Sequence, residues 1–108
     1  MEKGLHNIIA AIETVTVLIP EESGRGAVSS IKLTNSSTAI VEVDLYLEDY
    51  NAADNSENPT HIVKTDIPAK TSLVLDDDMS FNNSVLSLVI KTTGAQITAA
   101  TPLSIIIK

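Results

Sequence analysis

Three consecutive aspartates, Asp76, Asp77 and Asp78, come nearest in this chain to a chemical site. Calcium loops take carboxylates from alternate positions of a sharply turning loop that contains a glycine. Adjacent acids with no glycine after them lack that spacing, although Asn82 and Asn83 would add oxygen ligands. Aspartate and asparagine also end strands, hydrogen-bond their own backbone in turns and keep sheet edges charged. The pattern favours this second interpretation, so no metal site is expected and the three aspartates remain the only candidates for one.

The sequence offers little else for catalysis, because it has no cysteine and only two histidines, His6 and His61. His6 lies near the N-terminus and His61 follows a long polar segment, so both are expected at the surface. The triplet Gly24, Arg25 and Gly26 is too short for a phosphate-binding loop. Paired acids stand in turns and at strand ends, where water surrounds them and acid–base catalysis is disfavoured. We therefore predict a protein that is not an enzyme, with no catalytic residues and no cofactor.

Size and charge exclude several classes of partner. A chain of 108 residues suits one domain with a single core. Fourteen acidic against seven basic side chains give a net charge of −7, which repels phosphate backbones, so no nucleic-acid partner is expected. The apolar run at residues 8–12 is too short for a secretory signal, and no segment approaches the roughly 20 apolar residues of a membrane span. We expect synthesis in a cytoplasm and no membrane partner.

Apolar and polar residues alternate through most of the chain, which predicts β-strands. The clearest case is residues 39–48, where four aliphatic side chains point one way and charged or tyrosine side chains point the other. In residues 14–20 the alternation puts Val15, Val17 and Ile19 on one face. Further strands are expected in residues 61–67, 71–75, 84–91 and 103–108. About seven short strands separated by polar turns predict an all-β fold, an antiparallel two-sheet sandwich of immunoglobulin-like or jelly-roll-like type.

The N-terminal segment leaves two interpretations open. Four aliphatic residues stand at helical spacing and would form one face of a short amphipathic helix: Leu5, Ile8, Ile9 and Ile12. An extended arm that leads into the first strand fits the same residues, and we favour the arm. The predicted organisation is therefore an N-terminal arm, residues 1–13, followed by one β-sandwich domain, residues 14–108.

The C-terminal strand also allows two interpretations. Ile105, Ile106 and Ile107 form an aliphatic run followed only by Lys108. At a sheet edge this strand would pair with another chain, whereas inside a sheet it would be ordinary core. The arm, the polar loop at residues 51–60 and this strand are the three candidate docking surfaces. The predicted partner-binding residues are Leu5, Ile8, Ile9, Ile12, Ile105, Ile106 and Ile107.

Three stretches, SSIKLTNSSTAIVEVDLYLED, IPAKTSLVLDDDMSF and PLSIIIK, resemble a group of small virion structural proteins of tailed bacteriophages, known best from phages of cyanobacteria and other aquatic bacteria. The shared words are Leu33-Thr34-Asn35, the strand at residues 43–47 and the segment at residues 67–76. The resemblance spans residues 14–108 and includes no catalytic residue.

This resemblance implies a β-sandwich that is a structural part of the particle. The expected function is a capsid decoration (cement) protein that docks on the shell and reinforces it, with a neck or tail accessory protein as the alternative. The implied partners are the major capsid protein or neck and tail proteins, with a homo-oligomer also open, and the implied location is the virion. Docking through the arm leads us to expect that removal of residues 1–12 leaves the sandwich folded and impairs incorporation into particles.

A function from another class remains open, namely a calcium-dependent ligand- or carbohydrate-binding module that uses the acidic loop. Sugars commonly stack on aromatic rings, and this chain has only three aromatic residues. Tyr46 and Tyr50 are the only platforms that the sequence offers. The scarcity of aromatic side chains therefore disfavours this alternative.

Overall fold

A computed structural model describes residues 4–108 apart from 21, 25, 50–59, 77 and 84–85. The described part contains ten β-strands, and none of its elements is a helix long and apolar enough to cross a membrane. The strands are β1 (Gly4–Ile8), β2 (Thr14–Ile19), β3 (Ala27–Val28), β4 (Ile31–Asn35), β5 (Val41–Asp49), β6 (Thr60–Ile67), β7 (Thr71–Leu75), β8 (Met79–Ser80), β9 (Leu86–Thr93) and β10 (Leu103–Ile107).

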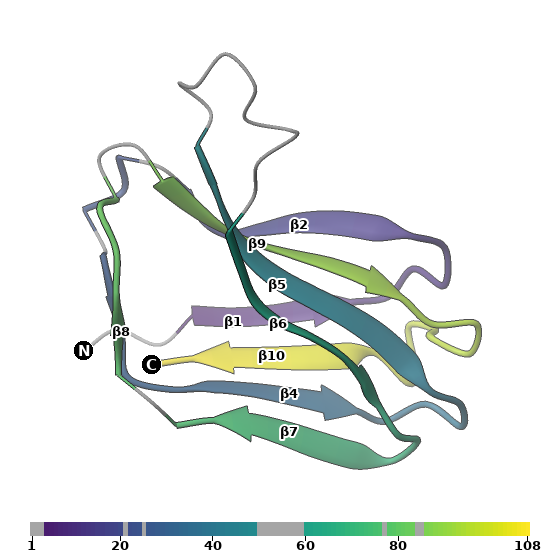
Figure 1. The fold of residues 1–108 in the computed structure, drawn as a ribbon. Coiled ribbons are helices and arrows are strands. Elements are labelled where there is room, and N and C mark those ends of the chain that lie inside the picture. Colours follow the sequence, from purple (N-terminus) through teal and green to yellow (C-terminus); the bar gives the residue numbers. More distant parts are fainter. Residues whose placement is uncertain (1–3, 21, 25, 50–59, 77, 84–85) are drawn as a thin grey trace.

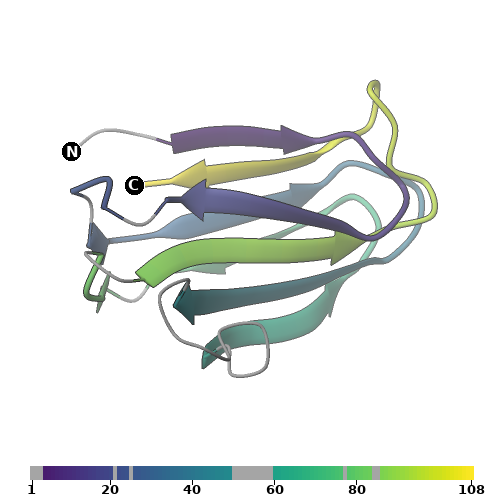
Figure 2. The ribbon, with the colours of Figure 1, turned by 90° about the horizontal axis from the view of Figure 1, so that it is seen from above.

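The ten strands of the described part pair in a nested order, the first with the last and so on inward. β1 pairs with β10, β2 with β9, β3 with β8, β4 with β7 and β5 with β6, all antiparallel. Two further pairings, β10 with β4 and β9 with β5, complete two four-stranded sheets. The first sheet has the order β1-β10-β4-β7 and the second β2-β9-β5-β6, and they stack face to face (Figures 1 and 2). The predicted antiparallel sandwich is confirmed, and its strand order is that of a jelly roll.

The described part has ten strands where about seven were predicted. β3 and β8 have two residues each, which is too short for an alternating pattern to appear in the sequence. They pair with each other in a small separate sheet at one end of the sandwich (Figure 1). Two further strands lie outside the predicted ranges: β4, and β1, which belongs to the segment that was predicted to be an arm.

The core is built almost entirely from branched aliphatic side chains between the two sheets. Such side chains suit the pleated surface of a β-sheet and disfavour a helix. The fully buried residues of the two central pairs of strands include Leu33, Leu45, Leu88, Ile90, Leu103, Ile105 and Ile107. In β4 and β5 the buried residues alternate with polar residues that face outward, and this sets the register, because a slip by one residue would turn the apolar side chains to water.

A bulge in β2 changes which of its residues face the core. The pairing of β2 with β9 shifts in register between Val17 and Ile19. Leu18 and Ile19 are buried, whereas Val15 and Val17 are exposed on the outer face of the second sheet. The prediction that Val15, Val17 and Ile19 share one face is therefore wrong, because a bulge adds one residue to a strand and interrupts the alternation.

The predicted N-terminal arm is part of the sandwich from residue 4 onward. It is extended rather than helical, and Gly4–Ile8 pairs in regular register with β10 as the edge strand of the first sheet. Ile8 is buried in the core, so it is not available to a partner. The strand forms because Ile8 fills core space next to Leu103, its cross-strand neighbour, while the preceding Asn7 faces outward.

The C-terminal strand lies inside a sheet. β10 pairs with β1 on one side and β4 on the other, so its backbone groups are used within the molecule. Ile105 and Ile107 are buried in the core and cannot serve as docking residues in the folded domain, contrary to their selection from the sequence. Ile106 is half-buried on the outer face of the first sheet, opposite Leu5 of β1.

A buried asparagine fastens the loops at one end of the sandwich. The Asn35 side-chain amide donates to the carbonyl oxygens of Ala39, Ile67 and Pro68 at 2.8, 2.9 and 3.1 Å. Its Oδ1 accepts from the Ser37 backbone N–H at 3.0 Å and the Ser37 hydroxyl at 2.6 Å. Asn35 therefore ties the β4–β5 connection to the β6–β7 turn.

Candidate functional site

The acidic run begins directly after β7, where the chain turns away from the first sheet. β7 ends at Leu75, and β8 begins at Met79 in the small sheet. Asp76 and Asp78 are exposed to solvent, and Asp77 lies outside the described residues. Within the described ranges, no three His, Cys, Asp or Glu side chains come together as a metal-binding group. The strand-end interpretation therefore accounts for the position of the two described aspartates.

The side-chain amide of Asn83, a possible oxygen ligand for a cation, makes hydrogen bonds within the protein instead. Its side-chain N–H groups donate to the carbonyl oxygens of Pro20 and Leu86 at 2.9 and 3.1 Å. Its Oδ1 accepts from the Ser23 hydroxyl at 3.0 Å and the Gly24 backbone N–H at 2.8 Å. Asn83 is buried and holds the β2–β3 connection against the segment before β9. The sequence indicated Asn83 as a possible cation ligand, but it did not indicate the hydrogen bonds that Asn83 makes within the protein.

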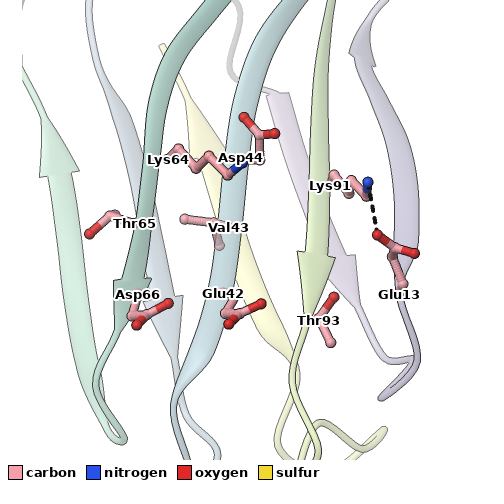
Figure 3. Close-up of a pocket in the computed structure, with 9 residues that line it drawn as sticks. All are labelled: Glu13, Glu42, Val43, Asp44, Lys64, Thr65, Asp66, Lys91 and Thr93. Carbon is pink, nitrogen blue, oxygen red and sulfur yellow. Dashed lines mark ion pairs between the residues drawn. The ribbon is translucent and has the colours of Figure 1, made fainter. Parts of the chain in front are cut away.

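A shallow charged groove crosses the outer face of the second sheet (Figure 3). Its volume is about 500 Å³. Its lining comes from β5, β6, β9 and the turn before β2, and comprises Glu13, Glu42, Val43, Asp44, Lys64, Thr65, Asp66, Lys91 and Thr93. Glu42 and Asp66 stand directly opposite each other on β5 and β6, and like charges in that position are destabilising. The groove thus combines hydroxyl groups with charges of both signs.

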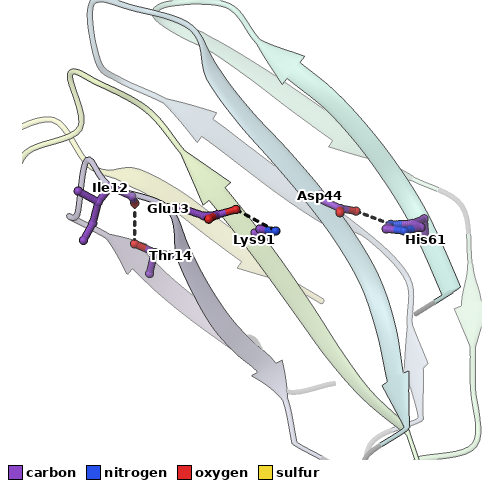
Figure 4. Close-up of polar contacts among 6 residues, drawn as sticks. All are labelled: Ile12, Glu13, Thr14, Asp44, His61 and Lys91. Carbon is purple, nitrogen blue, oxygen red and sulfur yellow. Dashed lines mark hydrogen bonds and ion pairs between the residues drawn. The ribbon is translucent and has the colours of Figure 1, made fainter. Parts of the chain in front are cut away.

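Two close polar contacts lie on this face, one between the turn before β2 and β9 and the other between β5 and β6 (Figure 4). Lys91 Nζ lies 2.8 Å from Glu13 Oε1, and this hydrogen bond, with the charge of Glu13, raises the pKa of Lys91 above its ordinary value. His61 Nδ1 lies 2.6 Å from Asp44 Oδ1. Solvent screens contacts at the surface, so these two contribute little to stability. The turn that presents Glu13 is held by the Thr14 hydroxyl, which donates to the Ile12 carbonyl oxygen at 2.8 Å.

Tyr46 lies on the same face of β5, beyond the groove. Its ring centroid is 6.0 Å from that of His61, with the two planes tilted by 59°. Burial raises the pKa of the Tyr46 hydroxyl, and the charges of Glu48 and Asp44 raise it further. The hydroxyl is therefore neutral at physiological pH. The second tyrosine named from the sequence, Tyr50, lies outside the described residues.

Exposed aliphatic side chains gather on the first two strands and the turn that joins them. Seven large hydrophobic side chains of the described residues are exposed, and five of them lie between residues 5 and 17. We call these five, Leu5, Ile9, Ile12, Val15 and Val17, the β1–β2 stripe. Their exposed fractions run from 38% for Val17 to 77% for Ile12. β1 and β2 are edge strands of the two sheets, so the stripe borders one side of the sandwich. Leu5 faces out from the first sheet there, and Val15 and Val17 face out from the second.

The stripe is poor in charge compared with the rest of the molecule. Between residues 4 and 19, Glu13 is the only Asp, Glu, Lys or Arg, in a chain with a net charge of −7. Depletion of charge at the centre distinguishes protein interfaces from ordinary surface. The stripe therefore shares with protein interfaces a low content of charged residues.

Three of the seven predicted partner-binding residues belong to this stripe, namely Leu5, Ile9 and Ile12. Val15 and Val17 were not selected, because simple alternation placed them on the same face as the buried Ile19. The available signal was the run of three aliphatic residues at positions 17–19, which interrupts the alternation just where the bulge occurs. Nearly all of the predicted docking loop at residues 51–60 lies outside the described residues.

Comparison with known proteins bears on the fold alone. No protein-family model matches the chain, and no curated protein matches it. Among solved structures it is similar to PirA, with a TM-score of 0.52 and 10% identity over 97% of this chain and 90% of that one. At that identity the likeness shows a shared fold.

Two other solved structures show weaker likeness. One contains the CBM22-1 and GH10 modules of xylanase 10B from Clostridium thermocellum, complexed with xylohexaose, with a TM-score of 0.43 and 11% identity over 97% of this chain and 25% of that one. The other is from the Gt strain of infectious bursal disease virus, with a TM-score of 0.28 and 12% identity over 98% and 31% of the two chains. Neither is close enough to support an argument about this protein.

Proposed function

We propose that the protein is a non-enzymatic structural component of a phage particle, a decoration protein that docks on the capsid through the β1–β2 stripe. The observation that carries this proposal is the concentration of exposed aliphatic side chains in one charge-poor segment. Neck or tail proteins are the alternative partners. The resemblance of residues 14–108 to small virion proteins supports the choice of particle, and jelly rolls are common among viral capsid proteins.

The physical properties of the domain suit this function. A shell needs reinforcement from a rigid body with a docking face, and a close-packed aliphatic core provides the rigid body. Repeated copies on a symmetric lattice hold firmly through modest individual contacts, because each contact that forms assists its neighbours. The charge of −7 keeps the unassembled protein soluble despite the exposed stripe.

The proposal is tested by locating the protein in purified virions. Quantitative mass spectrometry of particles from the phage that encodes it should find the protein at a copy number in simple ratio to the major capsid protein. Density for a jelly roll should appear on the outer capsid surface in cryo-electron microscopy, with the β1–β2 stripe against the shell. Absence of the protein from particles that carry a complete set of capsid proteins would contradict a structural role.

A saccharide-binding module is the second candidate, and the groove beside Tyr46 is the observation that favours it. Hydroxyl groups and paired charges hydrogen-bond sugar hydroxyls, and a tyrosine ring stacks on sugar faces. A calcium-dependent form of this function predicts that Ca²⁺ at about 1–10 mM, above the dissociation constants of roughly 0.1–1 mM of weak extracellular sites, raises the melting temperature. The structural proposal predicts no shift on addition of Ca²⁺ and no binding on a glycan array.

A further inference from the structure

A second, apolar cleft opens on the side of the sandwich opposite the β1–β2 stripe. It has a volume of about 270 Å³ and lies between β6 and β7, near the small β3–β8 sheet. Its lining is Val28, Ile31, Ile62, Val63, Leu75, Asp78 and Met79. Six of these seven residues are apolar, and the seventh, Asp78, is exposed to solvent.

The hydrophobic core is incompletely covered on this side. Seven hydrophobic residues pack against the core and remain partly exposed, and five of them belong to β6, β7 and β8: Ile62, Val63, Leu73, Leu75 and Met79. The inward-facing residues of the central strands β9 and β10, such as Leu88 and Ile105, are fully buried. Most of the partly exposed core residues therefore lie at the edge formed by β6 and β7, and an apolar side chain placed in the cleft there would bury more of their surface.

The backbone beside the cleft is ready to pair with another strand. In the described part of the chain, β7 is the last strand of its sheet and pairs with β4 on one side only. Its register with β4 is regular over all of Thr71–Leu75, without a bulge, and its sequence TSLVL contains no proline and no charge. Charges, prolines and bulges are the usual protection of a sheet edge against strand addition. The edge strand of the other sheet, β6, has a register shift and carries Lys64 and Asp66.

Charge at the cleft selects among apolar partners. Asp78 lines the cleft, and Asp76 is exposed directly after the last residue of β7. A basic side chain next to the inserted apolar group would meet the Asp78 carboxylate, whereas an acidic one would be repelled. Such complementarity gives specificity in addition to the backbone hydrogen bonds of an added strand.

We propose that this cleft binds an extended segment of a partner protein, which adds to β7 as a fifth strand, inserts one large aliphatic side chain between β6 and β7, and places a lysine or arginine near Asp78. This interaction is independent of the function proposed for the β1–β2 stripe, since the two surfaces lie on opposite sides of the domain. It gives the domain two attachment points, one on each side.

A peptide selection tests the proposal with the folded, full-length chain. A library of random nonapeptides is displayed and selected on the immobilised protein, and the enriched peptides are synthesised and measured by fluorescence polarisation. We expect alternating apolar and polar positions, with a large aliphatic residue and a neighbouring lysine or arginine. On binding, amide hydrogen exchange in Thr71–Leu75 should slow.

Three variants locate the binding site. Val63→Phe fills the cleft and should weaken binding of the enriched peptides at least about tenfold, as loss of a central anchor does. Val15→Phe is the matched control, because Val15 lies on β2 at the opposite side of the domain and is 55% exposed, and it should leave affinity unchanged. Asp78→Lys, an exposed substitution that should not disturb folding, is expected to reduce the affinity of basic peptides about threefold or more.

Four outcomes would overturn the proposal. These are failure to enrich any peptide family, enrichment without the aliphatic–basic pattern, protection of amides elsewhere, and equal affinity for wild type and Asp78→Lys. If Val63→Phe does not fold, judged by its melting temperature, amide protection and Asp78→Lys decide the result. A concentration-dependent dimer that Asp78→Lys abolishes would replace the partner segment with a second copy of this chain.

Discussion

At the scale of single residues, two buried asparagines organise the loops at opposite ends of the sandwich. Asn35 and Asn83 each use both ends of the side-chain amide, as donor to backbone carbonyl oxygens and as acceptor from a serine hydroxyl and a backbone N–H. Loop backbone that turns inward must find such partners, because an unpaired polar group in the interior is costly. These side chains fix the connections between strands that the aliphatic core alone would leave unspecified.

Asn35→Ala should reduce the free energy of unfolding by about 2–4 kcal/mol, because it removes the amide donor to the Ile67 and Pro68 carbonyl oxygens and the acceptor of the buried Ser37 N–H and hydroxyl groups. Urea denaturation followed by circular dichroism measures the change. Ser36→Ala is the matched control, since the exposed Ser36 hydroxyl makes a single hydrogen bond to the Pro102 carbonyl oxygen. Ordinary surface substitutions change stability by up to about 0.5 kcal/mol. A loss below that value in Asn35→Ala would contradict a stabilising function for the Asn35 hydrogen bonds.

Tyr46 should ionise above its ordinary pKa of 10.0, because burial and the nearby charges of Glu48 and Asp44 favour the neutral hydroxyl. A raised pKa means that the folded state holds this proton more tightly than the unfolded state. The resulting stabilisation is present below pH 10.0 and is lost as pH rises through the pKa of the folded protein.

Spectrophotometric titration of a Tyr50→Phe variant isolates this ionisation, since Tyr46 is then the remaining tyrosine. Glu48→Gln should lower the midpoint, and Lys91→Gln should raise it, because the Lys91 charge favours the tyrosinate. A midpoint at or below 10.0 in the folded protein would contradict the account of this environment.

Residue types alone indicated where polar groups lie but not what they contact. The aspartate run was placed at the end of a strand from local turn chemistry, which depends on neighbouring residues only. The function of Asn83 depends on Ser23 and Pro20, some sixty residues away along the chain. Nothing in the short-range pattern identifies such a contact, because it exists only once the strands have paired.

At the scale of elements, β1 belongs to the folded domain. Its removal would expose the edge of β10 and the core around Ile8. A chain that lacks residues 1–8 should therefore melt about 10 °C or more below the full chain, since loss of a buried isoleucine side chain costs about 2–5 kcal/mol. This replaces the expectation, drawn from the sequence, that residues 1–12 can be removed without loss of the fold.

Differential scanning calorimetry of three proteins distinguishes the two views of this segment. The full chain and Leu5→Ser, which changes an exposed residue of the same strand, should melt within a few degrees of each other. The shortened chain should melt well below both. Equal melting temperatures for all three would mean that β1 is an attached arm after all.

The strands that could be predicted are those with long, uninterrupted alternation. β5 is nine residues long with a buried aliphatic at every second position from Val41 to Leu45, and its pattern cannot be satisfied by a helix. In β2, alternation alone does not predict which side chains are buried. Its bulge puts Val15 and Val17 on the face opposite to Ile19, and no glycine or proline within the strand indicates the bulge. The stripe was therefore only partly predicted.

At the scale of the whole molecule, the nested pairing of all ten strands creates two unlike sides. One side is formed by β1 and β2, near the beginning of the chain, and carries the exposed stripe. The other side is formed by β6 and β7, near the middle of the chain, and contains the apolar cleft. Alternation predicts which elements are strands, whereas the order of strands in each sheet depends on long-range pairing. The sandwich was therefore predictable, with a jelly-roll-like type as one of two alternatives, but the choice between the two types and the position of the two surfaces were not.

The most direct test of a docking function is the addition of purified protein to capsids made without it. Wild-type protein should bind at saturating, stoichiometric occupancy and raise the temperature at which the capsids release DNA. The double variant Ile9→Ser and Ile12→Ser, which removes two of the most exposed stripe residues and leaves the core intact, should bind at least about tenfold more weakly and give no protection. Binding and protection by the double variant equal to those of the wild type would contradict docking through the β1–β2 stripe.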